Sequence, residues 1–459
     1  MNWILHLGLG SFHRAHQAVY LHRLIEQGET GWALAGGNLR PDMAEVIDAL
    51  VAQNGEYTLE TFAPDGQAHY ERIRSLQRVV PFEPSLAGLI EIGAHPDTLI
   101  ISFTVTEAGY YLDAKNRLDT SFADLRSDLD GRTRGTIYGA LAAILGERKA
   151  RSAGPVTLMN CDNLRSNGER FRAGLLDFLE RRGDTALRDW VGAHTSCPNA
   201  MVDRITPRPS PDVAQRVKAA TLWDDRAPVM GERFIQWVIE DRFAAARPAW
   251  EKVGAEMVAS VHAHEEAKIR ILNAPHSCIA WAATLKGLTY IHEGVAVPAI
   301  RSMAHAYVTE DVIPCLDRPG QPSPNDLAAY RDVVLDRFSN AHLRDTNQRV
   351  AMDGFSKIPG FIVPTLRERL ARGESIRATA VLPALFLAFL GRWHRGELGC
   401  EYQDGVMEPP VAHGFFAAAD PLAAYCADSL LWGSLAGNEA LVGAMRSARR
   451  EVEQFLSGA

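Results

Sequence analysis

Residues 1–20 read MNWILHLGLGSFHRAHQAVY. The apolar run Trp3–Leu7 predicts a strand that ends at two glycines, and apolar spacing predicts a helix over Phe12–Gln27. In a dinucleotide-binding βα unit the first glycine permits the tight turn, and the second lets the backbone approach the pyrophosphate. The order of strand, loop and helix therefore predicts such a site. The residues predicted to contact the cofactor here are Gly8, Gly10, Ser11 and Phe12.

The glycine fingerprint is incomplete, because its third glycine is replaced by His13. An ordinary glycine-rich turn is therefore the alternative interpretation. At the end of the next predicted strand the chain reads GGNLR, residues 36–40, without the acidic residue that takes a bidentate hold on a ribose 2′-OH. Asn38 can still hydrogen-bond ribose, while Arg40 can stack on adenine or attract a 2′-phosphate. The residues alone leave NAD and NADP open.

The first part of the chain alternates short apolar runs with amphipathic helices, which is typical of a parallel sheet. The predicted strands are 3–7, 32–35, 57–61, 99–106 and 156–160. The predicted helices are 12–27, 43–53, 84–92, 136–149 and 168–181. We expect an α/β domain of Rossmann type here.

After about His262 the strand pattern stops, and helices with apolar residues at i, i+3 and i+4 follow one another. They are predicted over 265–285, 299–314, 326–338, 378–392 and 438–456. Residues 317–325, rich in Pro, Gly and Asn, predict an exposed loop. We therefore expect two domains, residues 1–260 for the dinucleotide and residues 261–459, mainly α-helical, for the substrate.

Composition limits the function classes. The 459 residues carry a net charge of −8 and no basic patch with interleaved aromatics, so nucleic acid is not an expected partner. The longest apolar run, Ala380–Leu390, is too short to cross a bilayer, and the first residues lack the features of a signal peptide. We expect a cytoplasmic protein without a membrane partner. The six cysteines form no C-x-x-C pair, which argues against disulfides and structural zinc.

One face of the helix predicted over 265–285 carries the most specific chemistry. At about 100° per residue, Lys268, Asn273 and His276 lie within about 140° of one another, and Glu265 lies in the same arc. The remaining surface of this helix is apolar, which predicts that the helix is buried. A lysine in such surroundings tends to lose its proton.

Pro275 is an anomaly on this helix. It removes a backbone N–H donor and clashes with the carbonyl four residues earlier, so we expect a kink near residues 271–273. The kink can re-aim Asn273 and His276, or it can mark a helix break, and the residues do not decide between the two.

Motifs along the chain resemble the polyol-specific long-chain dehydrogenases, the mannitol dehydrogenase family. They are GLGSFHRAH (8–16), TVTEAGY (104–110), NCDNLRSNG (160–168), MVDRITP (201–207), KIRILNAPHS (268–277) and DGFSKIP (353–359). The motifs span both predicted domains, so the resemblance covers nearly the whole chain. It implies an enzyme that interconverts a polyol and a ketose with a nicotinamide cofactor.

Oxidation of a secondary alcohol needs a base for the hydroxyl proton, a hydride acceptor and hydrogen-bond donors for the developing alkoxide. The sequence contains no recognisable set of zinc ligands, so we expect no metal. By resemblance Lys268 is the base; its pKa must fall from about 10.4 to about 8, and burial can supply this shift. The alternative is a structural lysine in a salt bridge with Glu265 or Glu266.

The resemblance implies roles for further residues. Asn163 and Asn273 form the amide pair that stabilises the oxyanion, and His276 hydrogen-bonds the substrate hydroxyl. The positions that match binders of the distal hydroxyls are Asp203, Arg349 and Lys357. Glu107 and Glu265 match carboxylates that carry protons between the lysine and solvent in relatives. Thr106 is a further residue expected to bind the cofactor. Ordinary ion pairs are the alternative for these charged groups.

Within the family, GGNLRPDM (36–43) and NGEYTLET (54–61) most resemble the members that oxidise D-arabinitol. This favours NAD as cofactor and D-xylulose as product. Mannitol 2-dehydrogenases and the reductases of fructuronate or tagaturonate are the close alternatives. A catalytically silent dinucleotide sensor is the alternative from another class, and the intact lysine, asparagine and histidine set argues against it. The resemblance favours a monomer.

Overall fold

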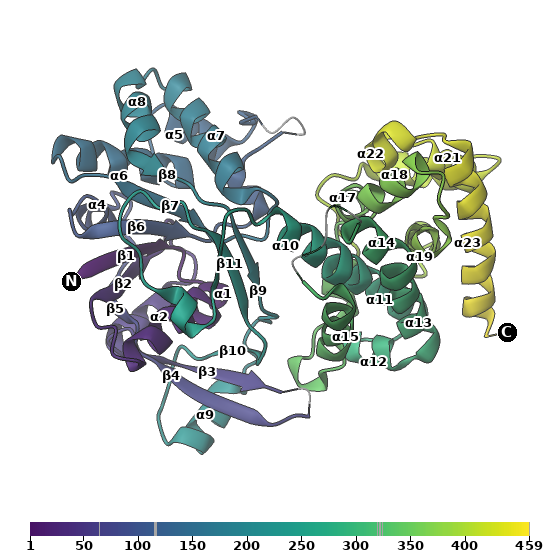
Figure 1. Cartoon of the computed structure of the whole chain (residues 1–459), viewed down its shortest axis with the longest axis horizontal. Helices are drawn as coiled ribbons and strands as arrows, with labels where there is room; N and C mark the ends of the chain where they lie inside the picture. The colour runs from purple at the N-terminus through teal and green to yellow at the C-terminus, as the bar shows by residue number, and fades with distance from the viewer. Residues whose placement is uncertain (64, 114–116, 319, 321–322, 324, 459) are drawn as a thin grey trace. The chain divides into compact units, whose positions relative to one another are not determined.

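The computed structural model describes residues 1–63, 65–113, 117–318, 320, 323 and 325–458, without the side chain of Glu107. The described residues divide into two compact units (Figure 1). Unit 1 comprises Met1–Phe62 and Ala68–His262, and unit 2 comprises Ala63–Gln67 and Ala263–Ala459. The main division thus falls after His262, and a short segment of the first part of the chain is grouped with unit 2.

A parallel sheet forms the centre of unit 1. Its strands are β1 (Asn2–Leu7), β2 (Trp32–Gly37), β5 (Leu76–Val80), β6 (Thr98–Phe103), β7 (Val156–Asn160) and β8 (Thr195–Ser196). Their order is β5-β2-β1-β6-β7-β8, and all neighbours run parallel. The strand order reverses between β1 and β6, and such sheets bind ligands at the carboxyl ends of the strands on either side of that reversal. The predicted Rossmann-type domain is confirmed.

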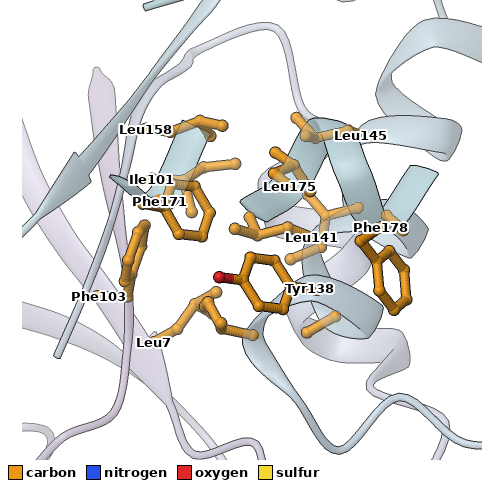
Figure 2. Close-up of a cluster of buried hydrophobic side chains, with 14 of the residues drawn as sticks. Leu7, Ile101, Phe103, Tyr138, Leu141, Leu145, Leu158, Phe171, Leu175 and Phe178 are labelled. Atoms are coloured by element: carbon orange, nitrogen blue, oxygen red, sulfur yellow. The ribbon is translucent and has the colours of Figure 1, made fainter. Parts of the chain in front are cut away.

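The two faces of this sheet pack into separate hydrophobic cores, because successive side chains of a strand point to opposite faces. Leu7 and Phe103 belong to the core that Figure 2 shows, where the rings of Tyr138 and Phe171 fill the space between sheet and helices. The helices of this face are α4 (Ala87–Gly93), α6 (Ile137–Ala150), α7 (Asn167–Arg181) and α8 (Thr185–His194). Ile4 and Ile100 face the other core.

The helix predicted over 12–27 is split at His16, whose φ of −128° and ψ of −87° are not helical. The ring of His16 bonds the carbonyl of Gln236 through Nε2 at 2.8 Å. This contact joins residues 220 positions apart, so the local pattern could not reveal it. The helical segments of unit 1 besides those above are α1 (Ser11–Ala15), α2 (Gln17–Glu26), α3 (Ala44–Ala52), η1 (Glu107–Tyr110), α5 (Ala123–Leu129), α9 (Val213–Thr221) and η2 (Trp250–Val253).

The strand predicted over 57–61 forms as β3 (Tyr57–Phe62), but it lies outside the parallel sheet. It pairs antiparallel with β4 (Ala68–Ile73) and parallel with β10 (Val229–Glu232). Its predicted place in the alternating parallel pattern is therefore wrong. The reason is that β4 follows within a few residues, and strands so closely connected pair as an antiparallel hairpin. Another sheet joins β12 (Glu256–Val258), β11 (Gln236–Glu240) and β9 (Ala200–Asp203).

The described residues of unit 2 form helices, as predicted. The α-helices are α10 (His262–Ala267), α11 (Ala274–Leu285), α12 (Ile291–Ala296), α13 (Pro298–Ala306), α14 (Ile313–Leu316), α15 (Leu327–Phe338), α16 (Asn347–Ala351), α17 (Gly354–Lys357), α18 (Val363–Ala371), α19 (Arg377–His394), α20 (Pro409–Ala417), α21 (Pro421–Cys426), α22 (Ser429–Trp432) and α23 (Glu439–Ser457). The loop predicted over 317–325 lies partly outside the described residues. Over the described part of the whole chain, no helix combines the length and the apolar character that crossing a bilayer requires.

Three π-helical turns interrupt the described helices of unit 2: η3 (Lys268–Asn273), η4 (Tyr307–Val312) and η6 (Ile358–Ile362). Each ends two residues before a proline, namely Pro275, Pro314 and Pro364. A proline in a regular α-helix clashes with the carbonyl four residues earlier, whereas π-helical bonds run from i to i+5 and change this spacing. The irregularity that Pro275 predicted therefore takes the form of a π-helical turn. The turn η3 packs beside both η4 and η6.

Candidate active site

The loop after β1 requires glycine at its first position. Gly8 has a φ of +105°, and a Cβ there would lie 2.7 Å from the carbonyl oxygen of Thr104. Its N–H donates to the carbonyl of Gly37 at 2.9 Å, at the end of β2. Gly8 thus lets the backbone after β1 pass close to the backbone after β6.

Gly10 is needed for a different reason. A Cβ at Gly10 would meet no heavy atom of the described residues within 4 Å, so open space adjoins the backbone there. Its φ of −69° and ψ of 174° are accessible to any residue. The second fingerprint glycine admits a pyrophosphate against the backbone, and the open space at Gly10 fits that use.

The end of β2 is tied to this loop by Asn38. Its Oδ1 accepts the N–H of Leu9 at 2.8 Å, and its Nδ2 donates to the carbonyl of Asp42 at 3.3 Å. Arg40 forms an ion pair with Asp124 at 2.7 Å and also donates to the hydroxyl of Tyr111 at 2.6 Å. A guanidinium that already faces a carboxylate is a weaker receptor for a 2′-phosphate than a free one.

The loop after β6 is held by Asp162, a residue that the sequence interpretation missed. The Oδ1 atom of this buried carboxylate accepts the N–H groups of Val105 at 3.0 Å and Thr106 at 2.8 Å. Its Oδ2 atom accepts the hydroxyl of Tyr110 at 3.2 Å. The aspartate in the motif NCDN, directly after β7, is the signal that could have indicated it, because the carboxyl ends of neighbouring parallel strands meet at one edge.

His13, at the position of the third fingerprint glycine, is buried and stacks on His6 with ring centroids 3.4 Å apart. His6 Nδ1 lies 2.8 Å from Ser102 Oγ. Burial lowers the pKa of His13 well below its usual value and that of His6 to about 3, so both rings are neutral near pH 7. Within the described residues no group of three or more His, Cys, Asp or Glu side chains is arranged to hold a metal ion.

In unit 2 the turn η3 brings Lys268 and Asn273 onto one face. Residues five apart lie about 140° from each other on an α-helix, but a π-helical turn closes from i to i+5, which places them one turn apart. Lys268 is 6% exposed, and η3 packs against α15, η4 and η6. The site therefore offers a sheltered amine one turn from an amide. A regular α-helix would set these two side chains farther apart around the axis.

Asp345 joins two of the residues that the resemblance placed at the substrate, and sequence reasoning missed it. Its Oδ2 lies 3.2 Å from Nε2 of His276, and its Oδ1 accepts from Nε and Nη2 of Arg349 at 2.8 and 2.6 Å. Burial alone would raise the pKa of Asp345, but the contacts with His276 and Arg349 outweigh it and lower this pKa to about 2. The His276 ring stacks on Phe338 with centroids 4.5 Å apart. Asp345 lies two residues before α16 and four residues before Arg349, and this spacing could have indicated the pair.

Burial lowers the pKa of His276 below its usual value, against the opposing effect of Asp345. His276 is therefore neutral near pH 7, and the Asp345 carboxylate lies beside its ring. Lys357, the last residue of α17, donates from Nζ to the carbonyl of Val350 at 2.7 Å. Burial lowers the pKa of this amine to about 8.

The other predicted site residues are placed as follows. Glu265 is buried in α10, and its neighbour Glu266 forms an ion pair with Arg270 at 2.6 Å. In unit 1, Asp203 is buried at the end of β9, and Asn163 is exposed after β7. The side chain of Glu107 lies outside the described residues.

Comparison with known proteins gives the class. Residues 2–252 match the mannitol dehydrogenase Rossmann domain, and residues 260–453 match the mannitol dehydrogenase C-terminal domain. The chain therefore belongs to the mannitol dehydrogenase family of oxidoreductases, and the resemblance drawn from its motifs is confirmed.

Within that family the chain is similar to the D-arabinitol 4-dehydrogenase of Ralstonia nicotianae, with 62% identity over 98% of this chain and 97% of the relative. It is also similar to the D-arabinitol 4-dehydrogenase of Klebsiella pneumoniae, with 55% identity over 96% of each chain. A solved ternary complex of Pseudomonas fluorescens mannitol 2-dehydrogenase with NAD and D-mannitol is 33% identical, with a TM-score of 0.85 over 100% of this chain and 94% of that chain.

Proposed function

We propose that the protein oxidises a secondary alcohol of a polyol to a ketose with NAD, and that D-arabinitol, converted to D-xylulose, is its preferred substrate. The names of relatives at 62% and 55% identity support this substrate over mannitol, whose 2-dehydrogenases are 33–36% identical. The observation that carries the reaction type is the sheltered amine of Lys268 one π-helical turn from Asn273, in a chain of this family.

NAD is supported by the glycine loop and by the ion pair of Arg40 with Asp124, which does not favour a 2′-phosphate. The residues proposed to hold it are Gly8, Gly10, Ser11, Phe12, Asn38, Arg40 and Thr106. When bound, NAD supplies the acceptor for the hydride that leaves the alcohol carbon. The protein's part is to fix this carbon, remove the hydroxyl proton and stabilise the charge that develops on oxygen.

Lys268 is the proposed base that accepts the hydroxyl proton, and this role leaves no need for a metal-bound hydroxide. Asn163 and Asn273 are the proposed donors to the developing alkoxide, and His276 is proposed to hold the reacting hydroxyl. The proposed contacts of the distal hydroxyls are Asp203, Arg349 and Lys357. The carboxylates proposed to return protons to solvent are Glu107 and Glu265. The absence of a metal, the monomeric state and the cytoplasmic location stay predictions.

A substrate panel tests the proposal. We expect NAD with D-arabinitol to give a higher kcat/KM than NAD with D-mannitol or NADP with either polyol, measured by the absorbance of the reduced nicotinamide. Chromatography should identify D-xylulose. A hundredfold preference for fructuronate in the reverse direction would assign the chain to the uronate reductases. Binding of NADH without turnover of any substrate would favour the dinucleotide sensor.

Two glycine variants distinguish an effect on stability from an effect on cofactor binding. Gly8→Ala is expected to lower the free energy of unfolding by about 1–3 kcal/mol, because its φ is positive and its Cβ would meet Thr104. Gly10→Val is expected to leave stability within about 0.5 kcal/mol, since its backbone is unstrained, and to weaken NADH binding by about tenfold or more. Denaturant melts and fluorescence titration with NADH measure both effects. Unchanged NADH affinity in Gly10→Val would place the dinucleotide elsewhere.

A further inference from the structure

The loop after β6 has an unusual backbone at Thr106. Its φ of 65° and ψ of 167° fall in a region that is essentially restricted to glycine. A β-branched residue there is strained, because its Cβ crowds the backbone. Such a conformation persists only where its surroundings impose it.

The carboxylate of Asp162 bonds the chain on both sides of Thr106. Oδ1 accepts the N–H groups of Val105 and of Thr106, at 3.0 and 2.8 Å, and Oδ2 also lies 3.1 Å from the N–H of Val105. Bonds to two successive N–H groups fix the φ and ψ of Val105 and the direction in which the chain enters Thr106. Oδ2 further accepts the hydroxyl of Tyr110, which anchors the far end of the same loop.

Asp162 is itself fixed to the sheet and its helices. Its N–H donates to Oδ1 of Asn160 at 2.7 Å, and its carbonyl accepts Nδ2 of Asn167, in α7, at 3.0 Å. The carbonyl of Tyr110 accepts the hydroxyl of Tyr138, from α6, at 2.9 Å. The strained loop is thus connected at both ends to rigid elements of unit 1.

The charge of Asp162 is costly where it lies. The carboxylate is 4% exposed, and the donors that contact it are neutral N–H and O–H groups. Burial raises the pKa of Asp162 to about 6, although these hydrogen bonds oppose the rise. The described side chains pair no cation with this charge, so it needs a reason other than stability.

We infer that Asp162 is a positioning residue that holds Thr106 in its strained conformation and so preforms the loop after β6 for the dinucleotide. The inference rests on the proposed function, because the ligand of this loop is NAD only if that proposal holds. Asp162 acts through the backbone of residues 105 and 106 and needs no contact with the cofactor.

A double-mutant cycle tests this inference. Asp162→Asn removes the negative charge and replaces one accepting oxygen by an amide that donates, so the Tyr110 hydroxyl loses its acceptor and the bonds from the two N–H groups weaken. We expect it to weaken NADH binding about tenfold or more in the wild-type background. In a Thr106→Gly background the same change should weaken binding about threefold or less, because glycine adopts the positive φ without strain. Fluorescence titration with NADH measures all four proteins without turnover.

The matched control is Asp225→Asn. Asp225 is another buried carboxylate of unit 1 that accepts backbone N–H groups, from Thr58 and Ala227. We expect this variant to lower the thermal midpoint and to leave NADH affinity unchanged. Equal losses for Asp162→Asn in the wild-type and Thr106→Gly backgrounds would show a merely structural role and overturn the inference.

The pH dependence of NADH binding tests the inference on the wild-type protein, without any variant. NADH affinity should fall as the pH drops through about 6, because protonation replaces one accepting oxygen of Asp162 by a donor. Among the described side chains, the titratable groups that interact with this carboxylate are Tyr110 and Cys161. Burial raises both pKa values well above their usual range, so both groups stay neutral there. A flat profile between pH 8 and 5 would overturn the inference. Absence of NADH binding at every pH would overturn the proposed function itself.

Discussion

Replacing Lys268 with alanine is expected to lower kcat for D-arabinitol by about a hundredfold to ten-thousandfold, the range that a positioned general base contributes. The amine is 6% exposed, so bulk water cannot readily take over its role. NADH affinity should change by less than about threefold, because the proposed partner of Lys268 is the alcohol and not the dinucleotide. Steady-state kinetics and fluorescence titration give the two quantities.

Lys286→Ala is the matched control, since Lys286 is an exposed lysine at the end of α11, and it should leave kcat unchanged. Lys357→Ala is the informative comparison, because burial lowers the pKa of Lys357 to about 8 and makes it the rival base. We expect this variant to raise KM more than it lowers kcat, because a contact to a distal hydroxyl binds substrate and transition state alike. If Lys268→Ala kept kcat within tenfold and Lys357→Ala did not, the two roles would have to be exchanged.

The parts of the fold that sequence could predict are those that a short stretch determines. The strand, glycine loop and helix of residues 1–20 are local, and the structure shows why Gly8 must be glycine at that turn. The helices of unit 2 follow from apolar spacing alone. Pro275 predicted an irregular helix, but not its form, because the choice between a kink and a π-helical turn depends on the neighbouring turns η4 and η6.

The parts that sequence could not predict depend on distant partners. The polar positions Gln77 and Arg78 hide β5, which pairs with β2 in the parallel sheet and which the apolar pattern did not indicate. Arg40 meets Asp124 from 84 positions away. Asp162 stands in the motif NCDN and Asp345 stands four residues before Arg349, but neither signal tells which distant groups the carboxylate contacts; the fold shows those contacts. Sequence therefore named residues that are proposed to touch ligands and missed Asp162 and Asp345, which contact some of them.

Asp345→Ala is expected to lower kcat/KM for D-arabinitol by about a hundredfold, because Asp345 bonds the Arg349 guanidinium and lies 3.2 Å from the His276 ring. The acid limb of the kcat/KM profile should move to lower pH. Asp345 opposes the lowering of the His276 pKa by burial, so its removal lets that pKa fall further. Asp345→Asn keeps an oxygen for Arg349 and should recover part of the loss, which a purely steric role would not explain.

Stability gives an independent readout of the same residue. The folded protein lowers the pKa of Asp345 from 3.8 to about 2, so its charge contributes about 2 kcal/mol to the free energy of unfolding above pH 4. This contribution is lost as the pH falls through 2, so wild type and Asp345→Ala should differ most near neutral pH and converge in acid. Asp336→Ala removes an exposed carboxylate paired with Arg301 and should change stability by less than about 0.5 kcal/mol at any pH. A pH-independent difference between wild type and Asp345→Ala would mean that packing, rather than charge, connects Asp345 to His276 and Arg349.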